Sequence, residues 1–251
     1  MPSIAYDRRG SGEPLLLIHS LGTDRNAWRP VLDRLAAERD VIAIDLPGFG
    51  ESPSLEGDDR PSPPRLAAAV AQFLEEIGIA RPHVAGNSLG GWVALELGLS
   101  GHARSVTAIA PAGLWARPLG PKPSVARRIA QTVEPLLEKL MASAGARRLA
   151  LAGTMAHPER VPAEDAVRLV RAYATAPGFA TVNAAMRSGV FSRLADIDVP
   201  VTLAWAEHDR LVARPRSLPS QVRNVELKGC GHVPMWDDPE QVTAVLLAGS
   251  A

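Results

Sequence analysis

The sequence of 251 residues contains a single cysteine, Cys230. One cysteine cannot form a disulfide within the chain, and it excludes a Cys-x-x-Cys metal site. The chain also lacks an excess of either charge, because 27 Lys and Arg residues balance 27 Asp and Glu residues. A neutral chain provides no overall electrostatic reason to bind nucleic acid or an anionic membrane.

Long apolar runs are absent as well. No run reaches the roughly 18 residues that suggest a membrane-spanning helix, so we expect no membrane span. The segment Met1–Asp7 has no basic stretch followed by an apolar one, so we expect no signal peptide there. These features together predict a cytoplasmic protein.

Short apolar runs alternate with helical patterns in the first part of the chain. Continuous apolar runs are typical of strands that are buried on both faces of a parallel sheet. The segments between them have apolar residues at helical spacing. We expect strands near 4–9, 15–19, 41–44, 82–85 and 106–110, and helices near 26–37, 63–77 and 92–99. This alternation predicts an α/β protein with a mostly parallel central sheet flanked by helices.

The alternation stops after Pro111 and resumes near residue 199. The region between shows helical patterns and no clear strand. We expect cap helices near 125–142, 146–154 and 163–176, then strands at 199–205 and 222–227 and a closing helix at 239–247. The interpretation is a sheet domain formed by residues 1–112 and 191–251, with a helical cap inserted at 113–190.

The segment Gly86-Asn87-Ser88-Leu89-Gly90 fits the Gly-x-Ser-x-Gly pattern of a nucleophile elbow. Its glycines keep side chains out of the way where strand and helix nearly collide. Such a turn exposes the Ser88 hydroxyl at the carboxyl edge of the sheet. The Leu89 amide, in the first turn of the helix, then points at the carbonyl that Ser88 attacks. A buried serine in a glycine-rich turn fits the same five residues, so the rest of the chain has to decide.

A nucleophilic serine needs a base that takes its proton and a third group that orients the base. His232 follows the last expected strand, and the glycines at 229 and 231 permit a tight turn beside it. His208 also lies beyond the cap, but it is one residue from the carboxylate of Asp209 and too close to be oriented by it. We therefore expect His232 to be the base.

Asp209 follows the strand expected at 199–205, and it is the expected acid because the order serine, acid, histidine is typical of this type of site. Glu207 follows the same strand but lies closer to its end. The second oxyanion donor should come from the loop after the strand at 15–19. We expect the Leu21 amide there, with the Ser20 amide as the alternative. Losing one such donor typically costs about 3–4 kcal/mol of transition-state stabilisation.

These segments together resemble the α/β-hydrolase family over nearly the whole chain. The residues that carry the resemblance are His19–Gly22 with Trp28, Asp45–Ser52, Gly86–Gly91, Asp209 and Gly229–His232. The resemblance implies an α/β-hydrolase fold, a catalytic triad of Ser88, Asp209 and His232, a small-molecule substrate, and no metal or organic cofactor. Only one strand precedes Leu15, so the sheet should be shorter than the eight strands of the family.

Two subfamilies share local features with this chain. The segment Ser20–Asp24 with the following Trp28 resembles enol-lactonases. Gly86–Gly91 together with Pro111–Leu114 resembles C–C hydrolases of meta-cleavage products. The latter family has an asparagine at the position of Asn87 and an arginine that holds the substrate, for which Arg187 is the candidate. Asn87 either shapes the turn or contacts substrate.

The expected cap is basic, with 11 Lys and Arg residues against 5 Asp and Glu residues between 113 and 190. These charges either belong to solvated helix faces or form a cationic mouth that attracts carboxylated substrates. Four further residues either line an apolar pocket or belong to the core, namely Trp115, Trp205, Met235 and Trp236. The candidate substrate-binding residues are Asn87, Trp115, Arg187 and Val233.

The sequence thus predicts a serine hydrolase that cleaves a small carboxylic ester or lactone through an acyl-enzyme on Ser88. One alternative is hydrolysis of a C–C bond in a meta-cleavage-type ketoacid by the same triad. The other is a receptor on a hydrolase fold that binds a ligand and turns it over slowly.

Overall fold

The computed structural model describes residues 4–55, 61–120 and 124–251. Its centre is a seven-stranded sheet with the order β1-β3-β2-β4-β5-β6-β7. β1 pairs with β3 in the antiparallel sense, and the remaining strand pairs are parallel, which confirms the predicted mostly parallel sheet. The strands are β1 (Tyr6–Arg9), β2 (Pro14–Ile18), β3 (Asp40–Ile44), β4 (His83–Asn87), β5 (Ser105–Ile109), β6 (Val201–Ala206) and β7 (Arg223–Leu227).

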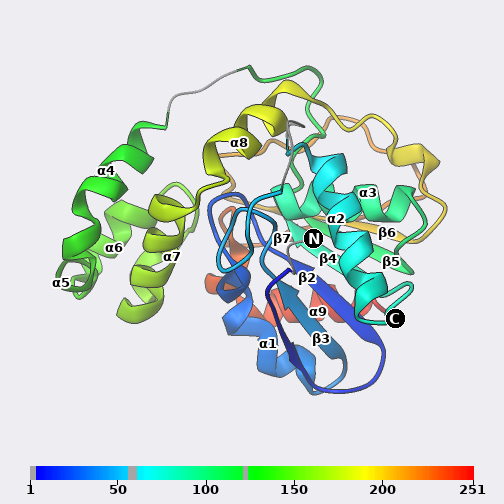
Figure 1. Ribbon diagram of the computed structural model, residues 1–251, viewed down its shortest axis with the longest axis horizontal. Coiled ribbons are helices and arrows are strands. Elements are labelled where there is room, and N and C mark those ends of the chain that lie inside the picture. Colours follow the sequence, from blue (N-terminus) through cyan, green and yellow to red (C-terminus); the bar gives the residue numbers. More distant parts are fainter. Residues whose placement is uncertain (1–3, 56–60, 121–123) are drawn as a thin grey trace.

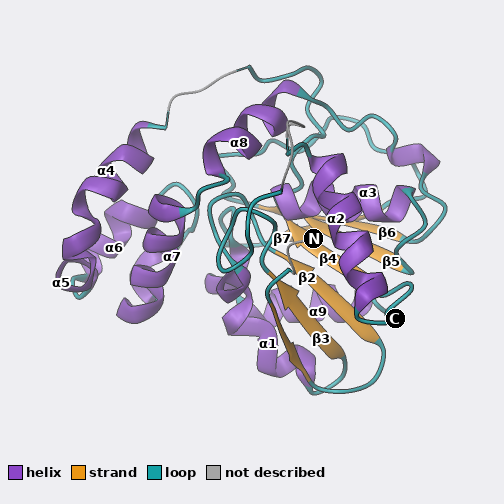
Figure 2. Cartoon of the chain, in the orientation of Figure 1, coloured by secondary structure: helices purple, strands orange, loops and turns teal. Residues whose placement is uncertain are grey.

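Helices cover both faces of this sheet, as Figures 1 and 2 show. α1 (Arg29–Ala36) and α9 (Pro239–Gly249) lie on one face, and α2 (Pro63–Glu76) and α3 (Leu89–Leu99) lie on the other. Among the described residues, no helix has the length and apolar content that crossing a membrane requires.

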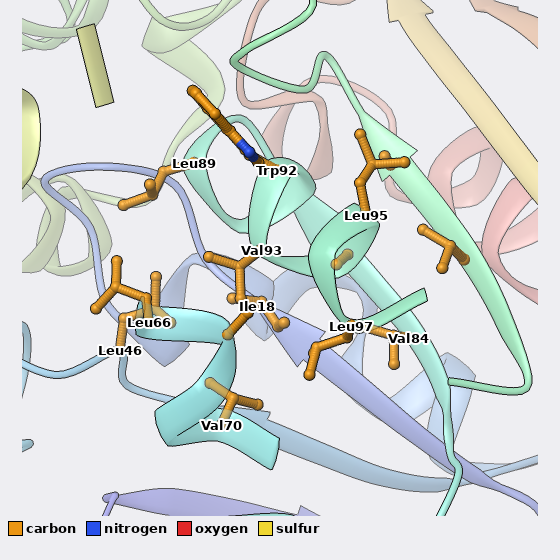
Figure 3. Packing of buried hydrophobic residues seen from close by; sticks show 14 of the residues in the cluster. Ile18, Leu46, Leu66, Val70, Val84, Leu89, Trp92, Val93, Leu95 and Leu97 are labelled. Carbon is orange, nitrogen blue, oxygen red and sulfur yellow. The ribbon is translucent and has the colours of Figure 1, made fainter. Parts of the chain in front are cut away.

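Successive residues of β2 pack on opposite faces of the sheet. Leu15 and Leu17 belong to the cluster that contains α1 and α9, whereas Leu16 and Ile18 belong to the cluster that contains α2 and α3. Figure 3 shows Ile18 beside Val93 of α3, with side chains of α2 nearby. A strand buried on both faces has no polar side to mark it, which explains its continuous apolar run in the sequence.

The chain between β5 and β6 forms further helices that gather largely to one side of the sheet domain (Figure 1). They are α4 (Val125–Val133), α5 (Leu137–Met141), α6 (Ala144–Leu151), α7 (Ala163–Thr175) and α8 (Phe179–Ser188). α7 is tied to α1 by an ion pair between Asp165 and Arg29 at 2.7 Å. The boundaries of the cap at 113 and 190 stay a prediction.

The cap helices differ from the expectation in two respects. The helix expected at 125–142 divides into α4, a 3-10 turn at Glu134–Leu136 and α5. Pro135 lies in that turn and lacks the amide hydrogen that a continuous helix needs. α8 lies beyond the last expected cap helix, although Phe179, Val182 and Met186 have helical spacing and are buried.

The backbone of α3 lies directly against the backbone of the sheet, with no side chain between them. A Cβ atom on Gly90 would lie 2.2 Å from the carbonyl oxygen of Ile18, at the end of β2. A Cβ atom on Gly86 would lie 2.1 Å from the carbonyl oxygen of Gly90. Both distances are far below van der Waals contact, so only glycine permits this approach. The approach brings the start of α3 against the loop that follows β2.

We expect Gly90→Ala to destabilise the protein. The new methyl group would collide with backbone at Ile18, which cannot rotate away as a side chain can. Overpacking of this kind costs about 1–3 kcal/mol or more, and each kcal/mol lowers the Tm by about 2–4 °C in a chain of this size. Gly153→Ala is the matched control, because a Cβ there meets nothing within 4 Å. Equal Tm values for the two variants would contradict this account.

Candidate active site

Ser88 occupies the sharp turn between β4 and α3. Its φ of 56° and ψ of −112° lie outside the regions that L-residues favour. The Ser88 amide donates to the Ile109 carbonyl at 2.9 Å, and the Ser88 carbonyl accepts from the Ala112 amide at 2.9 Å. Strain of this kind costs on the order of 1–3 kcal/mol and persists where the surroundings impose it, often at active sites. The structure therefore has the strained strand-to-helix turn that the motif predicts.

His232 and Asp209 meet at the same edge of the sheet. His232 Nδ1 lies 2.7 Å from Asp209 Oδ2, and both side chains are only 5% exposed. The other carboxylate oxygen, Oδ1, accepts the amides of Leu211 at 2.7 Å and Val212 at 3.0 Å. With a carboxylate on Nδ1, the neutral ring carries its proton there and leaves Nε2 as the acceptor.

The same contacts keep the Asp209 carboxyl ionised. Burial is the largest influence on its pKa and raises it. The hydrogen bond and charge of His232, together with the amides of Val212 and Leu211, outweigh burial and lower the pKa below its usual value. Asp209 thus stays a carboxylate throughout the neutral range. Glu207, the other candidate acid, is exposed and accepts the Gly229 amide at 2.8 Å.

Asn87 links the turn at Ser88 (the serine turn) to the loop 228–233 that carries His232 (the histidine loop). Its side-chain nitrogen donates to the carbonyl oxygen of His232 at 2.9 Å and to that of Ile109 at 3.2 Å. The residue is 0% exposed, and within the described part of the chain its Oδ1 has no hydrogen-bond partner. The contacts of Asn87 are those of a residue that shapes the turn and holds the backbone of His232.

The loop after β2 is held by a buried histidine. His19 Nε2 accepts the Leu46 amide at 2.9 Å, so Nδ1 carries the ring proton and donates to the Ser20 carbonyl at 2.8 Å. Burial lowers the pKa of His19 against the opposing charge of Asp45, which favours this neutral form. The Thr23 hydroxyl also donates to the Ser20 carbonyl, at 3.0 Å. In a trans peptide the next N–H points the opposite way, so the Leu21 amide faces away from these groups.

Comparison with known proteins identifies the family. A model of the alpha/beta hydrolase family matches residues 15–245. The chain belongs to the α/β hydrolase family.

Relatives of this α/β hydrolase act on different bonds. The chain is 34% identical to epoxide hydrolase EphH of Mycobacterium tuberculosis over 196 residues, which cover 72% of this chain and 91% of the relative. It is 30% identical to the pimeloyl-acyl-carrier-protein methyl ester esterase of Aeromonas hydrophila, with coverage of 97% and 98%. The crystal structure of the enol-lactonase of Burkholderia xenovorans LB400 has the same fold, with a TM-score of 0.77 at 23% identity and coverage of 98% and 96%.

The Asp45–Ser52 segment of the hydrolase supports the loops around the site. Asp45 is fully buried, and it accepts the Arg25 amide at 2.7 Å and forms an ion pair with the Arg25 guanidinium. Ser52 donates its hydroxyl to the Asp45 carbonyl at 2.7 Å. The segment carries part of the family resemblance in the sequence. In the structure its contacts stabilise the loop rather than form part of the expected triad.

Two cap aromatics, which no sequence motif indicates, lie beside the loop after β2. A Cβ atom on Gly22 would lie 2.7 Å from the Tyr173 ring and 3.1 Å from the Phe179 ring. The two rings pack edge to face with centroids 5.1 Å apart, and the Arg127 guanidinium lies 5.0 Å from the centre of the Phe179 ring. Tyr173 is half-buried and Phe179 is buried, and helical spacing does not say which loop such residues contact.

Arg187, the candidate substrate anchor, is engaged within the cap. Its Nε donates to the Gly120 carbonyl at 2.7 Å and its Nη2 to the Leu119 carbonyl at 3.4 Å. It lines a hollow of about 270 Å³ between α4 and α8, together with Arg127 and Arg128. The structure does not bring Arg187 into contact with Ser88 or His232, and its role toward substrate stays a prediction.

The remaining candidates are largely packed into the protein. Trp115 donates its indole N–H to the Gly189 carbonyl at 2.8 Å, and its ring packs edge to face on Trp92. Val233 is 2% exposed and directly follows the expected base. Trp205 and Met235 are core residues, at 5% and 0% exposed. A substrate contact for Trp115 or Val233 stays a prediction.

We expect Asp209→Asn to destabilise the protein in a pH-dependent way. Because the folded-state pKa of Asp209 lies below its ordinary value, the carboxylate adds stability that is present above about pH 4 and is lost as the pH falls through the folded-state pKa. The Tm difference from the unaltered protein should therefore shrink below about pH 4 in thermal melts. Asp33→Asn, at an 89% exposed side chain, is the control and should change little. A difference that grows in acid would contradict the prediction.

Proposed function

We propose that this α/β hydrolase cleaves small carboxylic esters or lactones through an acyl-enzyme on Ser88. The observation that carries the proposal is the buried His232–Asp209 pair, 2.7 Å apart, at the same edge of the parallel sheet as the strained turn of Ser88. Asn87 supports it further, because it ties the backbone of His232 to the strand that ends next to Ser88. The Asn87 side chain thus holds the backbone of the expected base relative to the strand that leads into Ser88.

Each residue has a defined role in the proposed reaction. His232 Nε2 takes the proton of the Ser88 hydroxyl as its oxygen attacks the substrate carbonyl, and Asp209 stabilises the imidazolium that forms. The amides of Leu89 and Leu21 donate to the oxyanion. His232 then protonates the leaving alkoxide, and it activates the water that cleaves the acyl-enzyme.

A serine nucleophile favours acyl substrates over epoxides. If Ser88 opened an epoxide, the product would be an ether, which has no carbonyl for water to attack. An ester or lactone gives an acyl-enzyme instead, and the same oxyanion donors assist its hydrolysis. The names of the relatives include both an epoxide hydrolase and an esterase. This chemistry supports the ester reaction for the present chain.

C–C hydrolysis by the same triad is the alternative enzyme activity. It needs a group that holds a substrate carboxylate, and the expected group, Arg187, donates to carbonyls of its own cap. We therefore favour the ester or lactone. A coloured ring-cleavage product that bleaches faster than a short ester is hydrolysed would reverse that preference. Ligand binding that raises the Tm without product release would indicate a receptor.

We expect Ser88→Ala to lower kcat for a short p-nitrophenyl ester by about 10⁴-fold or more, because no other group can form the acyl-enzyme. The measurement is the release of p-nitrophenol with time. Ser100→Ala is the matched control, since this serine is exposed and bonds only within its own helix end and to His102. Retained activity in Ser88→Ala would overturn the proposed function.

A further inference from the structure

Groups outside the histidine loop hold the backbone on both sides of His232. The Gly231 amide donates to Asp237 Oδ2 at 2.8 Å, and the Val233 amide donates to the carbonyl of Thr154 at 2.8 Å. Thr154 lies after α6 in the cap. The backbone that carries the expected base is therefore attached to the cap, and Asp209 fixes only its ring.

Asp237 is the side chain that makes this attachment. Its Oδ1 accepts the amides of Ala156 at 3.0 Å and His157 at 2.8 Å, and its Oδ2 accepts the amide of Gly231 and also lies 3.0 Å from the Ala156 amide. One carboxylate thus receives N–H groups from the cap on one side and from the histidine loop on the other. Charge-assisted bonds of this type are stronger than those between neutral groups.

The two segments also touch directly. A Cβ atom on Gly231 would lie 2.7 Å from the carbonyl carbon of Met155 and 2.8 Å from the Ala156 nitrogen. No side chain fits between the cap backbone and the histidine loop at this point. Asp237 therefore joins two backbones that are already in contact, and a small displacement of the cap would move the loop with it.

We propose that Asp237 is a positioning residue, which clamps cap residues 154–157 to the histidine loop and thereby sets the position of the His232 ring relative to Ser88. The inference rests on the proposed function, in which His232 is the base. It adds that the cap helps to position the expected general base.

Asp237→Asn would break the clamp while keeping the size and shape of the side chain. Its oxygen accepts N–H groups on one side only, and its NH₂ group would face an N–H donor on the other side. Either the bond from Gly231 or the bond from His157 is lost, whereas the Ala156 amide lies within reach of both oxygen positions. Asp237→Glu keeps both acceptor oxygens and should retain part of the activity that Asp237→Asn loses. Asp238→Asn is the control, because that carboxylate caps α9 by accepting the Gln241 amide at 2.8 Å.

The test is steady-state kinetics on a short p-nitrophenyl ester, with Tm and proton NMR of each variant. We expect Asp237→Asn to lower kcat by about 10- to 100-fold, as displacement of a catalytic group by about 1 Å does, and to change KM by less than about threefold. The low-field resonance of the His232 Nδ1 proton, identified by its loss in His232→Gln, should shift or broaden. Asp237→Glu should recover part of kcat, and Asp238→Asn should keep both kcat and the resonance.

If Asp237→Asn lowers the Tm but leaves kcat and the resonance unchanged, the proposal is overturned. The clamp would then stabilise the fold without positioning His232. If Asp237→Asn does not fold, Gly231→Ala provides the second variant, because its methyl group pushes the cap backbone away while Asp237 stays in place. Unchanged kcat in Gly231→Ala would also overturn it. The failure of the proposed function is distinguishable, because Ser88→Ala would then remain active.

Discussion

The site depends on one close contact between backbones, where Gly90 at the start of α3 lies against Ile18 at the end of β2. A methyl group on Gly90 would lie 2.2 Å from the Ile18 carbonyl oxygen. This contact places the serine turn beside the loop after β2, so the Leu21 and Leu89 amides come from neighbouring segments. The strained φ of Ser88, at 56°, is maintained by the surrounding structure.

The second half of the site is assembled by the loops after β6 and β7. The His208 amide donates to the Cys230 carbonyl at 2.9 Å, so the two loops share a backbone bond in addition to the Asp209–His232 contact. Asn87 then joins the histidine loop to the serine turn. Parallel strands end at the same edge of the sheet, which is why residues far apart in the chain meet there. These links leave the expected base little freedom to move.

The sheet and the expected triad could be predicted from the sequence for different physical reasons. Strands such as β2 are buried on both faces and read as continuous apolar runs, and the chain order of Ser88, Asp209 and His232 follows from the order of the strands. The cap could not be predicted in the same way. Helical periodicity shows which face is apolar but not what it meets, so neither Tyr173 beside Gly22 nor the bonds of Arg187 to its own cap could be foreseen. Asp237 gives no sequence signal, because its three partners are backbone amides.

The central claim is that Ser88 is a nucleophile activated by His232 and Asp209. Its most direct test is covalent labelling with an alkyl fluorophosphonate, followed by digestion and mass spectrometry of the peptides. The account predicts one phosphonyl group per chain, located on Ser88, with labelling lost in His232→Gln. Stoichiometric labelling of another residue, or no labelling of a preparation that hydrolyses esters, would contradict it.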